Sequence, residues 1–141
     1  MADATFTPVI NDYSHGVFSL GEQQHSGHIM ITGQDDTGFS VTSWSVSDPD
    51  NLTAADLDPI YDADNRPMLI LIGVGPDMTH PFAKLRAELS KRAIAVEIQS
   101  TPAACRTWNL LLSEGRKVAF VAIAMPTNTS LKDDNPQLSS S

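Results

Sequence analysis

A glycine-bearing loop is the first segment of the sequence whose residues could bind a ligand. Gly73-Val-Gly75 directly follows an apolar run, as the phosphate-binding turn of a dinucleotide site does. Met78 stands where that motif has its third glycine, and Pro76 lacks the backbone amide that could face a phosphate. The pattern therefore favours a structural turn, with a small anion bound at this loop as the alternative.

Cys105 is the chain's one candidate nucleophile. It stands near the start of a predicted helix and beside Arg106, and both the helix dipole and a cation favour a thiolate. Nucleophilic catalysis also needs an adjacent base, and all four histidines are far from Cys105 in the sequence. Because Cys105 also lies on the apolar stripe of its helix, the sequence favours a buried, inert thiol over a reactive one.

Arg106, Asn109 and Arg116 lie on the polar side of the same helix and just past its end. Together they could line a recognition patch. The alternative is a solvated helix face on which an arginine pairs with Glu114.

Histidines and paired carboxylates do not suggest a metal site or an acid–base site. His25 and His28 are three residues apart, and the alternation of a strand would place side chains at that spacing on opposite faces. The pairs Asp35-Asp36 and Asp133-Asp134 fall in a turn and a tail, where a solvated carboxylate is expected. We therefore predict no metal, no cofactor and no catalytic residue.

The elements that must position these residues differ between the two halves of the chain. The first half has strand signals at 16–20, 28–32 and 39–44, separated by glycines and by the hairpin-like turn Asp35-Asp36-Thr37-Gly38. We expect these three strands to form an antiparallel meander. A capping box at Thr53 and Asp56 then predicts a short helix near 54–62.

The second half alternates strand and helix. The apolar run 68–72, the helical spacing of Phe82, Leu85 and Leu89, and the strand 94–98 together predict a parallel βαβ unit. A second helix is expected to start with Thr101 as its N-cap and to end at Gly115. A final strand follows over 117–124. The predicted fold class is α/β, a three-layer single domain with a central mixed sheet, an N-terminal antiparallel meander and a C-terminal βαβ-α-β segment.

Composition excludes several partner classes. With 141 residues, 41% of them hydrophobic, the chain can bury one core, which we place at 10–126, between an N-terminal extension (1–9) and a disordered tail (127–141). A net charge of −8 disfavours nucleic acid and anionic lipid and favours cationic partner surfaces. A single cysteine allows no internal disulfide, and the first residues of the sequence resemble neither a signal peptide nor a transit peptide, so a cytoplasmic location is expected. No apolar run is long enough to span a membrane.

Several segments of the second half carry a resemblance to a known family. They are Leu69-Ile-Leu-Ile-Gly-Val-Gly75, Ala93-Ile-Ala-Val-Glu97, Thr101-Pro-Ala-Ala-Cys-Arg-Thr-Trp-Asn109 and Glu114-Gly-Arg116-Lys-Val. Over nearly all of residues 10–125 the chain resembles the domain-of-unknown-function family that includes mitochondrial NADH dehydrogenase (complex I) assembly factor 3. The resemblance implies a three-layer α/β fold and no established catalytic activity. For the mitochondrial branch it implies a chaperone-like role in building complex I through protein contacts.

Two functional hypotheses follow, and we favour the first. It is a non-enzymatic protein-interaction or assembly factor that contacts respiratory-complex subunits or another assembly factor through Arg106, Asn109 and Arg116. The alternative is a small-ligand or anion-binding protein, an unknown enzyme included, which would use the Gly73-Val-Gly75 loop, the Thr101 helix start and Cys105 around a shared concave pocket. A homodimer formed through the meander is a separate structural possibility.

Overall fold

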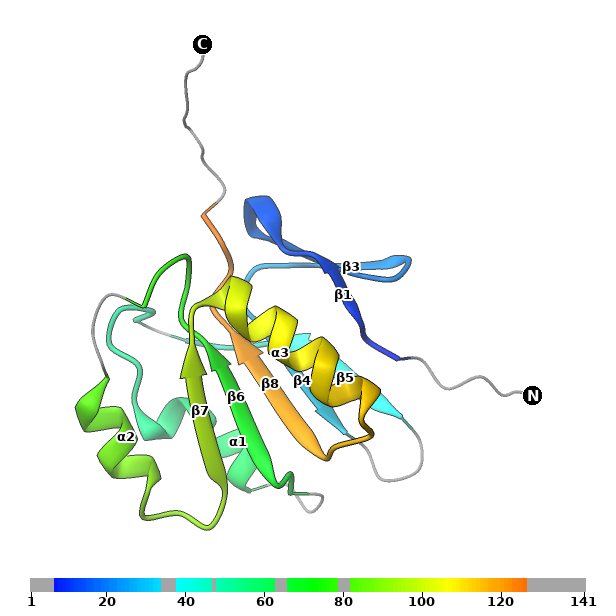
Figure 1. Ribbon diagram of the computed structural model, residues 1–141. Coiled ribbons are helices and arrows are strands. Elements are labelled where there is room, and N and C mark those ends of the chain that lie inside the picture. The colour runs from blue at the N-terminus through cyan, green and yellow to red at the C-terminus, as the bar shows by residue number, and fades with distance from the viewer. Residues whose placement is uncertain (1–6, 34–37, 47, 63–65, 79–81, 127–141) are drawn as a thin grey trace.

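The computed structural model describes residues 7–33, 38–46, 48–62, 66–78 and 82–126 (Figure 1). The strands are β1 (Ile10–Asp12), β2 (Val17–Leu20), β3 (Gln23–Ser26), β4 (Ile29–Gly33), β5 (Phe39–Ser43), β6 (Leu69–Gly73), β7 (Ala95–Gln99) and β8 (Val118–Ala122). The helices are the 3-10 turns η1 (Ser14–Gly16) and η2 (Ala54–Leu57), and α1 (Asp58–Tyr61), α2 (Ala83–Leu89) and α3 (Thr101–Ser113). The predicted tail 127–141 lies outside the described residues.

The strands form two sheets. A three-stranded antiparallel sheet has the order β1-β2-β3, and a five-stranded sheet has the order β5-β4-β8-β6-β7. In the larger sheet β6 runs parallel to both β7 and β8, whereas β4 is antiparallel to β5 and β8. The predicted mixed sheet is therefore confirmed. Although β8 comes last in the sequence, it lies at the centre, which explains why all five of its residues are buried.

The N-terminal antiparallel meander is present, but its strands are not the three that we expected. β2 pairs with β1 and β3, while β4 and β5 form a hairpin in the larger sheet. The chain passes from one sheet to the other at Gly27, whose φ of 88° is in the left-handed region that favours glycine. β1 and β3 escaped prediction because β1 is three residues long and β3, Gln-Gln-His-Ser, has no apolar alternation.

Two clusters of buried side chains cover the two faces of the larger sheet, so the predicted three layers are confirmed. Ile70 and Ile72 of β6 face η2, α1 and α2, whereas Leu71 faces α3 and the small sheet. All three side chains are fully buried. Burial on both faces explains why this strand reads as a continuous apolar run.

The predicted βαβ unit is confirmed, because β6 and β7 pair in parallel and α2 lies between them in the sequence. The short helix near 54–62 is also present, as the 3-10 turn η2 followed by one turn of α1. Its start is capped as expected, since the backbone N–H of Thr53 donates to the Asp56 carboxylate at 2.8 Å.

The start of α3 differs by one residue from the expectation. Ser100, and not Thr101, is the N-cap, and the Ser100 hydroxyl accepts a hydrogen bond from the Ala103 N–H at 3.3 Å. α3 ends as predicted just before Gly115, whose φ is 70°. In the part of the chain that the structure describes, no helix has the length and apolar character needed to cross a bilayer.

Candidate functional site

Thr101 joins three segments at the carboxyl ends of the parallel strands. Its side chain is fully buried, and its hydroxyl donates to the Ile123 carbonyl at 2.7 Å and accepts from the Gly75 N–H at 2.9 Å. The Thr101 N–H in turn donates to the Gly75 carbonyl at 2.7 Å. The loop after β6, the start of α3 and the end of β8 are therefore connected through one residue.

Gly73 allows α3 to approach the sheet closely. A Cβ atom at this position would lie 3.0 Å from the Thr101 hydroxyl oxygen and 3.1 Å from the Ala122 Cβ. Gly75 has a φ of 101°, a conformation that favours glycine. The fold therefore requires glycine at both positions, which fits the favoured interpretation of this segment as a structural turn.

The first turn of α3 has no backbone amide directed at an external ligand. Thr101 N–H donates to Gly75, Ala103 N–H to the Ser100 hydroxyl and Ala104 N–H to the Ser100 carbonyl. Pro102 has no N–H. An anion at a helix N-terminus is held by amides of this kind. The alternative function therefore lacks the donors that we assigned to it at this helix.

Cys105 lies in the interior, where burial raises the pKa of its thiol to about 12, despite the opposing effect of Arg106. The group is therefore a thiol at neutral pH and a poor nucleophile. This agrees with the inert thiol that the sequence favours.

Asn109 and the neighbouring Trp108 hold the N-terminal strand on α3. The Asn109 side-chain oxygen accepts from the Ile10 N–H, and its side-chain N–H donates to the Ile10 carbonyl, both at 2.9 Å. The Trp108 indole N–H donates to the Pro8 carbonyl at 2.9 Å. The packed part of the chain thus begins by Pro8, within the segment that we expected to be an extension. Asn109 has a structural task that no local sequence pattern indicates, because its partner is 99 residues away.

Arg106 and Arg116 are exposed, as a recognition patch requires. Arg116 lies 3.8 Å from the Glu114 carboxylate, and an exposed pair of this kind contributes little to stability. Sequence reasoning missed Leu110, which is 58% exposed and four residues after Arg106 on the same helix face. Its signal was present, since Leu110 falls off the apolar stripe formed by Ala104, Cys105, Trp108, Leu111 and Leu112.

A second exposed apolar side chain lies at the same end of the sheet. Met68, which is 66% exposed, precedes β6, and its N–H donates to the Lys117 carbonyl just before β8 at 2.9 Å. α3 ends four residues before β8 begins, so its last turn lies at this end too. We call Arg106, Leu110 and Arg116, on α3 and just past its end, the α3 surface. It combines one exposed apolar side chain with two cations.

His25 and His28 have local structural partners. His28 Nδ1 accepts from the Ala124 N–H at 2.9 Å, and burial lowers the pKa of His28 below its ordinary value. The His25 ring nitrogen Nε2 lies 3.0 Å from the His28 carbonyl. Among the described residues no group of three or more metal-ligating side chains occurs.

Relatives of this chain carry names that concern assembly. The chain is 32% identical over 127 residues to NADH dehydrogenase [ubiquinone] 1 alpha subcomplex assembly factor 3 of Danio rerio, a match that covers 90% of this chain and 70% of that protein. It is 32% identical over 116 residues to the protein of that name in Homo sapiens, covering 78% of this chain and 63% of the human one. The chain therefore spans roughly two thirds of these relatives.

A solved structure supports the same relationship. A crystal structure of a protein from Bordetella parapertussis matches with a TM-score of 0.70 and 26% sequence identity, covering 86% of this chain and 99% of that one. The family model described as "Protein of unknown function (DUF498/DUF598)" matches residues 10–123. With the βαβ unit, the Thr101 junction and α3 all inside that range, the chain belongs to the DUF498/DUF598 family of proteins of unknown function.

Proposed function

We propose that this chain is a non-enzymatic protein-interaction factor that assists the assembly of a multi-subunit respiratory complex. The observation that carries the proposal is the likeness to the zebrafish assembly factor across 90% of this chain. The expected partners are respiratory-complex subunits or a second assembly factor. The cytoplasmic location and the homodimer expected from the sequence stay predictions.

The roles of Thr101, Asn109 and Cys105 in the fold support a binding role over catalysis. The Thr101 hydroxyl and the Asn109 amide form hydrogen bonds that hold segments of the fold together. Cys105 is a buried thiol whose pKa of about 12 opposes ionisation. The side chains that the alternative function would use thus serve the structure.

The α3 surface is the contact that we assign to this function. Protein interfaces combine apolar side chains at their centre with polar groups around them, and arginine is enriched there. Leu110 supplies exposed apolar area, and Arg106 and Arg116 supply positive charge. A fitting partner therefore presents an apolar patch beside acidic side chains.

Affinity capture from the source organism, followed by mass spectrometry, tests the proposal. The bait is the full chain, compared with an Arg106→Glu, Leu110→Asp double variant. Asn109 is left intact, because its replacement would release β1 and confuse loss of contact with loss of structure.

A matched control is Arg66→Glu with Met78→Asp, which also alters one exposed cation and one exposed apolar residue, but Arg66 lies over the Tyr61 ring on the face of the sheet opposite α3. The proposal expects respiratory-complex subunits or assembly factors with the wild type and the control, and their loss with the α3 variant. If the wild type captures no specific protein, the proposal is wrong.

A further inference from the structure

One edge of the larger sheet is open to another strand. Among the described strands, β7 pairs with β6 alone. The Gln99 carbonyl accepts from the Val74 N–H, so Gln99 directs its backbone groups toward the β6 side. Successive residues of a strand direct these groups to alternate sides. The backbone N–H and C=O groups of Val96 and Ile98 therefore point outward from the sheet.

β7 itself carries no proline, lysine or bulge, three features that protect edge strands of native proteins from strand addition. The segment 93–99 reads Ala-Ile-Ala-Val-Glu-Ile-Gln, in which Glu97 is the one charged residue. β7 pairs with β6 residue for residue over its full length, without a register shift. Its outer edge is thus a regular template.

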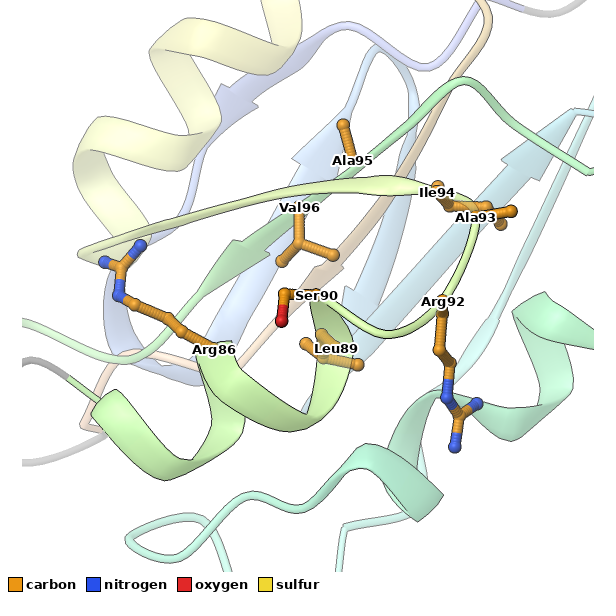
Figure 2. A pocket seen from close by; sticks show the side chains of 8 residues that line it. All are labelled: Arg86, Leu89, Ser90, Arg92, Ala93, Ile94, Ala95 and Val96. Atoms are coloured by element: carbon orange, nitrogen blue, oxygen red, sulfur yellow. The ribbon is translucent and has the colours of Figure 1, made fainter.

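A hollow adjoins the same edge, between β7 and α2. Its volume is about 390 Å³, and its lining includes Leu89, Val96, Ser90, Arg86 and Arg92. Figure 2 shows the Val96 and Leu89 side chains pointing toward each other, with Arg86 and Arg92 at opposite ends. The hollow therefore has an apolar middle and the Arg86 side chain at one end, whereas the Arg92 guanidinium points away from β7 toward α1, where it contacts Asp58.

Positive charge is concentrated here on a chain that is acidic as a whole. Four of the nine Lys and Arg residues fall within 84–92, against a net charge of −8. Arg92 is held in place, because its Nη1 lies 3.2 Å from the Asp58 carboxylate and its guanidinium lies 4.5 Å from the centre of the Tyr61 ring. The local field thus favours an acidic partner, although the overall charge favours a cationic one.

We propose that the outer edge of β7 binds an extended acidic segment of a partner protein, which adds to the sheet as a sixth strand. Backbone hydrogen bonds to Val96 and Ile98 supply the pairing, as in other cases of strand addition. An apolar side chain enters the hollow beside Val96, and acidic side chains two positions to either side lie in the positive field of the basic segment 84–92. This deepens the proposed function by giving a second contact and the chemistry of the segment that it takes.

The test uses a defined probe, so it does not depend on finding the native partner. The probe is a capped peptide, Thr-Thr-Glu-Thr-Val-Thr-Glu-Thr-Thr, which as a strand presents Glu, Val and Glu on one face. The ¹⁵N-labelled full chain is titrated with this peptide, with a version carrying Lys in place of Glu, and with a version whose alternate backbone amides are methylated. Backbone amide shifts and hydrogen exchange are recorded by NMR.

The proposal expects the acidic peptide to bind with a Kd below ~1 mM, slower amide exchange at Val96 and Ile98, and affinity that falls as salt rises. The lysine and methylated peptides should bind at least about ten-fold more weakly, a loss of ~1.4 kcal/mol. No saturable binding by 1 mM acidic peptide, or shifts confined to other residues, overturns the proposal. Slower exchange of these amides in the absence of peptide, increasing with protein concentration, would show that the edge pairs with a second copy of the chain and would also overturn the proposal.

Two variants locate the contact. Val96→Pro removes the N–H of residue 96, which points outward, and leaves unchanged the β7 N–H groups that donate to β6. Arg86→Glu with Lys91→Glu changes only exposed side chains, so it keeps the test valid if the proline variant does not fold. Either folded variant should weaken peptide binding about ten-fold or more, and Arg116→Glu should not. If the peptide binds but affinity capture finds no partner, the assembly role is wrong and the strand-addition site stands. If capture finds a respiratory partner but the peptide does not bind, the assembly role stands and the strand-addition site is wrong.

Discussion

Replacing Thr101 with valine should destabilise the fold strongly although the two side chains have nearly the same shape. The hydroxyl is fully buried, donates to the Ile123 carbonyl at 2.7 Å and accepts from the Gly75 N–H at 2.9 Å. Valine can make neither bond, so a buried carbonyl and a buried N–H both lose this partner. Leaving a buried group unsatisfied costs about 1–3 kcal/mol, and we expect a total loss of about 2–4 kcal/mol.

Thr101→Ser is the matched control. Serine keeps the hydroxyl and removes one buried methyl group, so it should cost only about 1 kcal/mol. Urea unfolding at neutral pH measures both variants. With a urea dependence of ~1.5 kcal/mol per M, a loss of ~3 kcal/mol lowers the unfolding midpoint by ~2 M. If Thr101→Val costs no more than Thr101→Ser, the hydroxyl does not hold the junction and the structural account of this site is refuted.

Four further results follow from the same contacts. Asn109→Ala should lower the free energy of unfolding by about 1–3 kcal/mol and speed hydrogen exchange at Ile10, while the five-stranded sheet stays protected. Equal exchange at Ile10 in the wild type and in this variant would contradict the role of Asn109 in holding β1 on α3. Gly73→Ala should cost about 1–3 kcal/mol in urea unfolding, because its methyl group falls within 3.1 Å of neighbouring atoms. Burial lowers the pKa of His28 in the folded chain below its ordinary 6.5, so as the pH falls the imidazole of the unfolded chain is protonated first. The contribution of neutral His28 to stability should therefore be complete above pH 6.5 and decline as the pH falls from there toward the folded pKa. His28→Gln should flatten this part of the pH dependence of the urea unfolding midpoint. Cys105 should react with a thiol reagent at pH 8 far more slowly in the folded protein than in urea, since its pKa is about 12 when folded; equal rates would contradict its burial.

The sequence predicted the second half of the fold better than the first, for a physical reason. The βαβ unit and α3 carry their own periodicity, helix punctuation and apolar runs. β1 and β3 are short and mostly polar, so their pairing depends on contacts made elsewhere. One such contact is the clamp between Asn109 and Ile10, separated by 99 residues, which no local pattern indicates.

The candidate site shows the same division. The predicted burial of Cys105 and the exposure of Arg106 followed from helix periodicity, whereas Arg116 lies past the end of α3. The task of Thr101 did not, because a threonine at a helix start usually indicates a cap, whereas this one is buried between two strand ends. Leu110 was overlooked although it departs from the apolar stripe. The basic segment 84–92 indicates a binding site only once the fold places it beside the unpaired edge of β7.

The most direct test of the central claim is to delete the gene for this chain in its source organism and to measure assembled respiratory complex I on native gels, with subunit amounts quantified in parallel. Assembled complex should fall while its subunits are still made. The wild type and the Arg66→Glu, Met78→Asp control should restore it, and the Arg106→Glu, Leu110→Asp variant should not. An unchanged amount of assembled complex in the deletion strain would refute the assembly role.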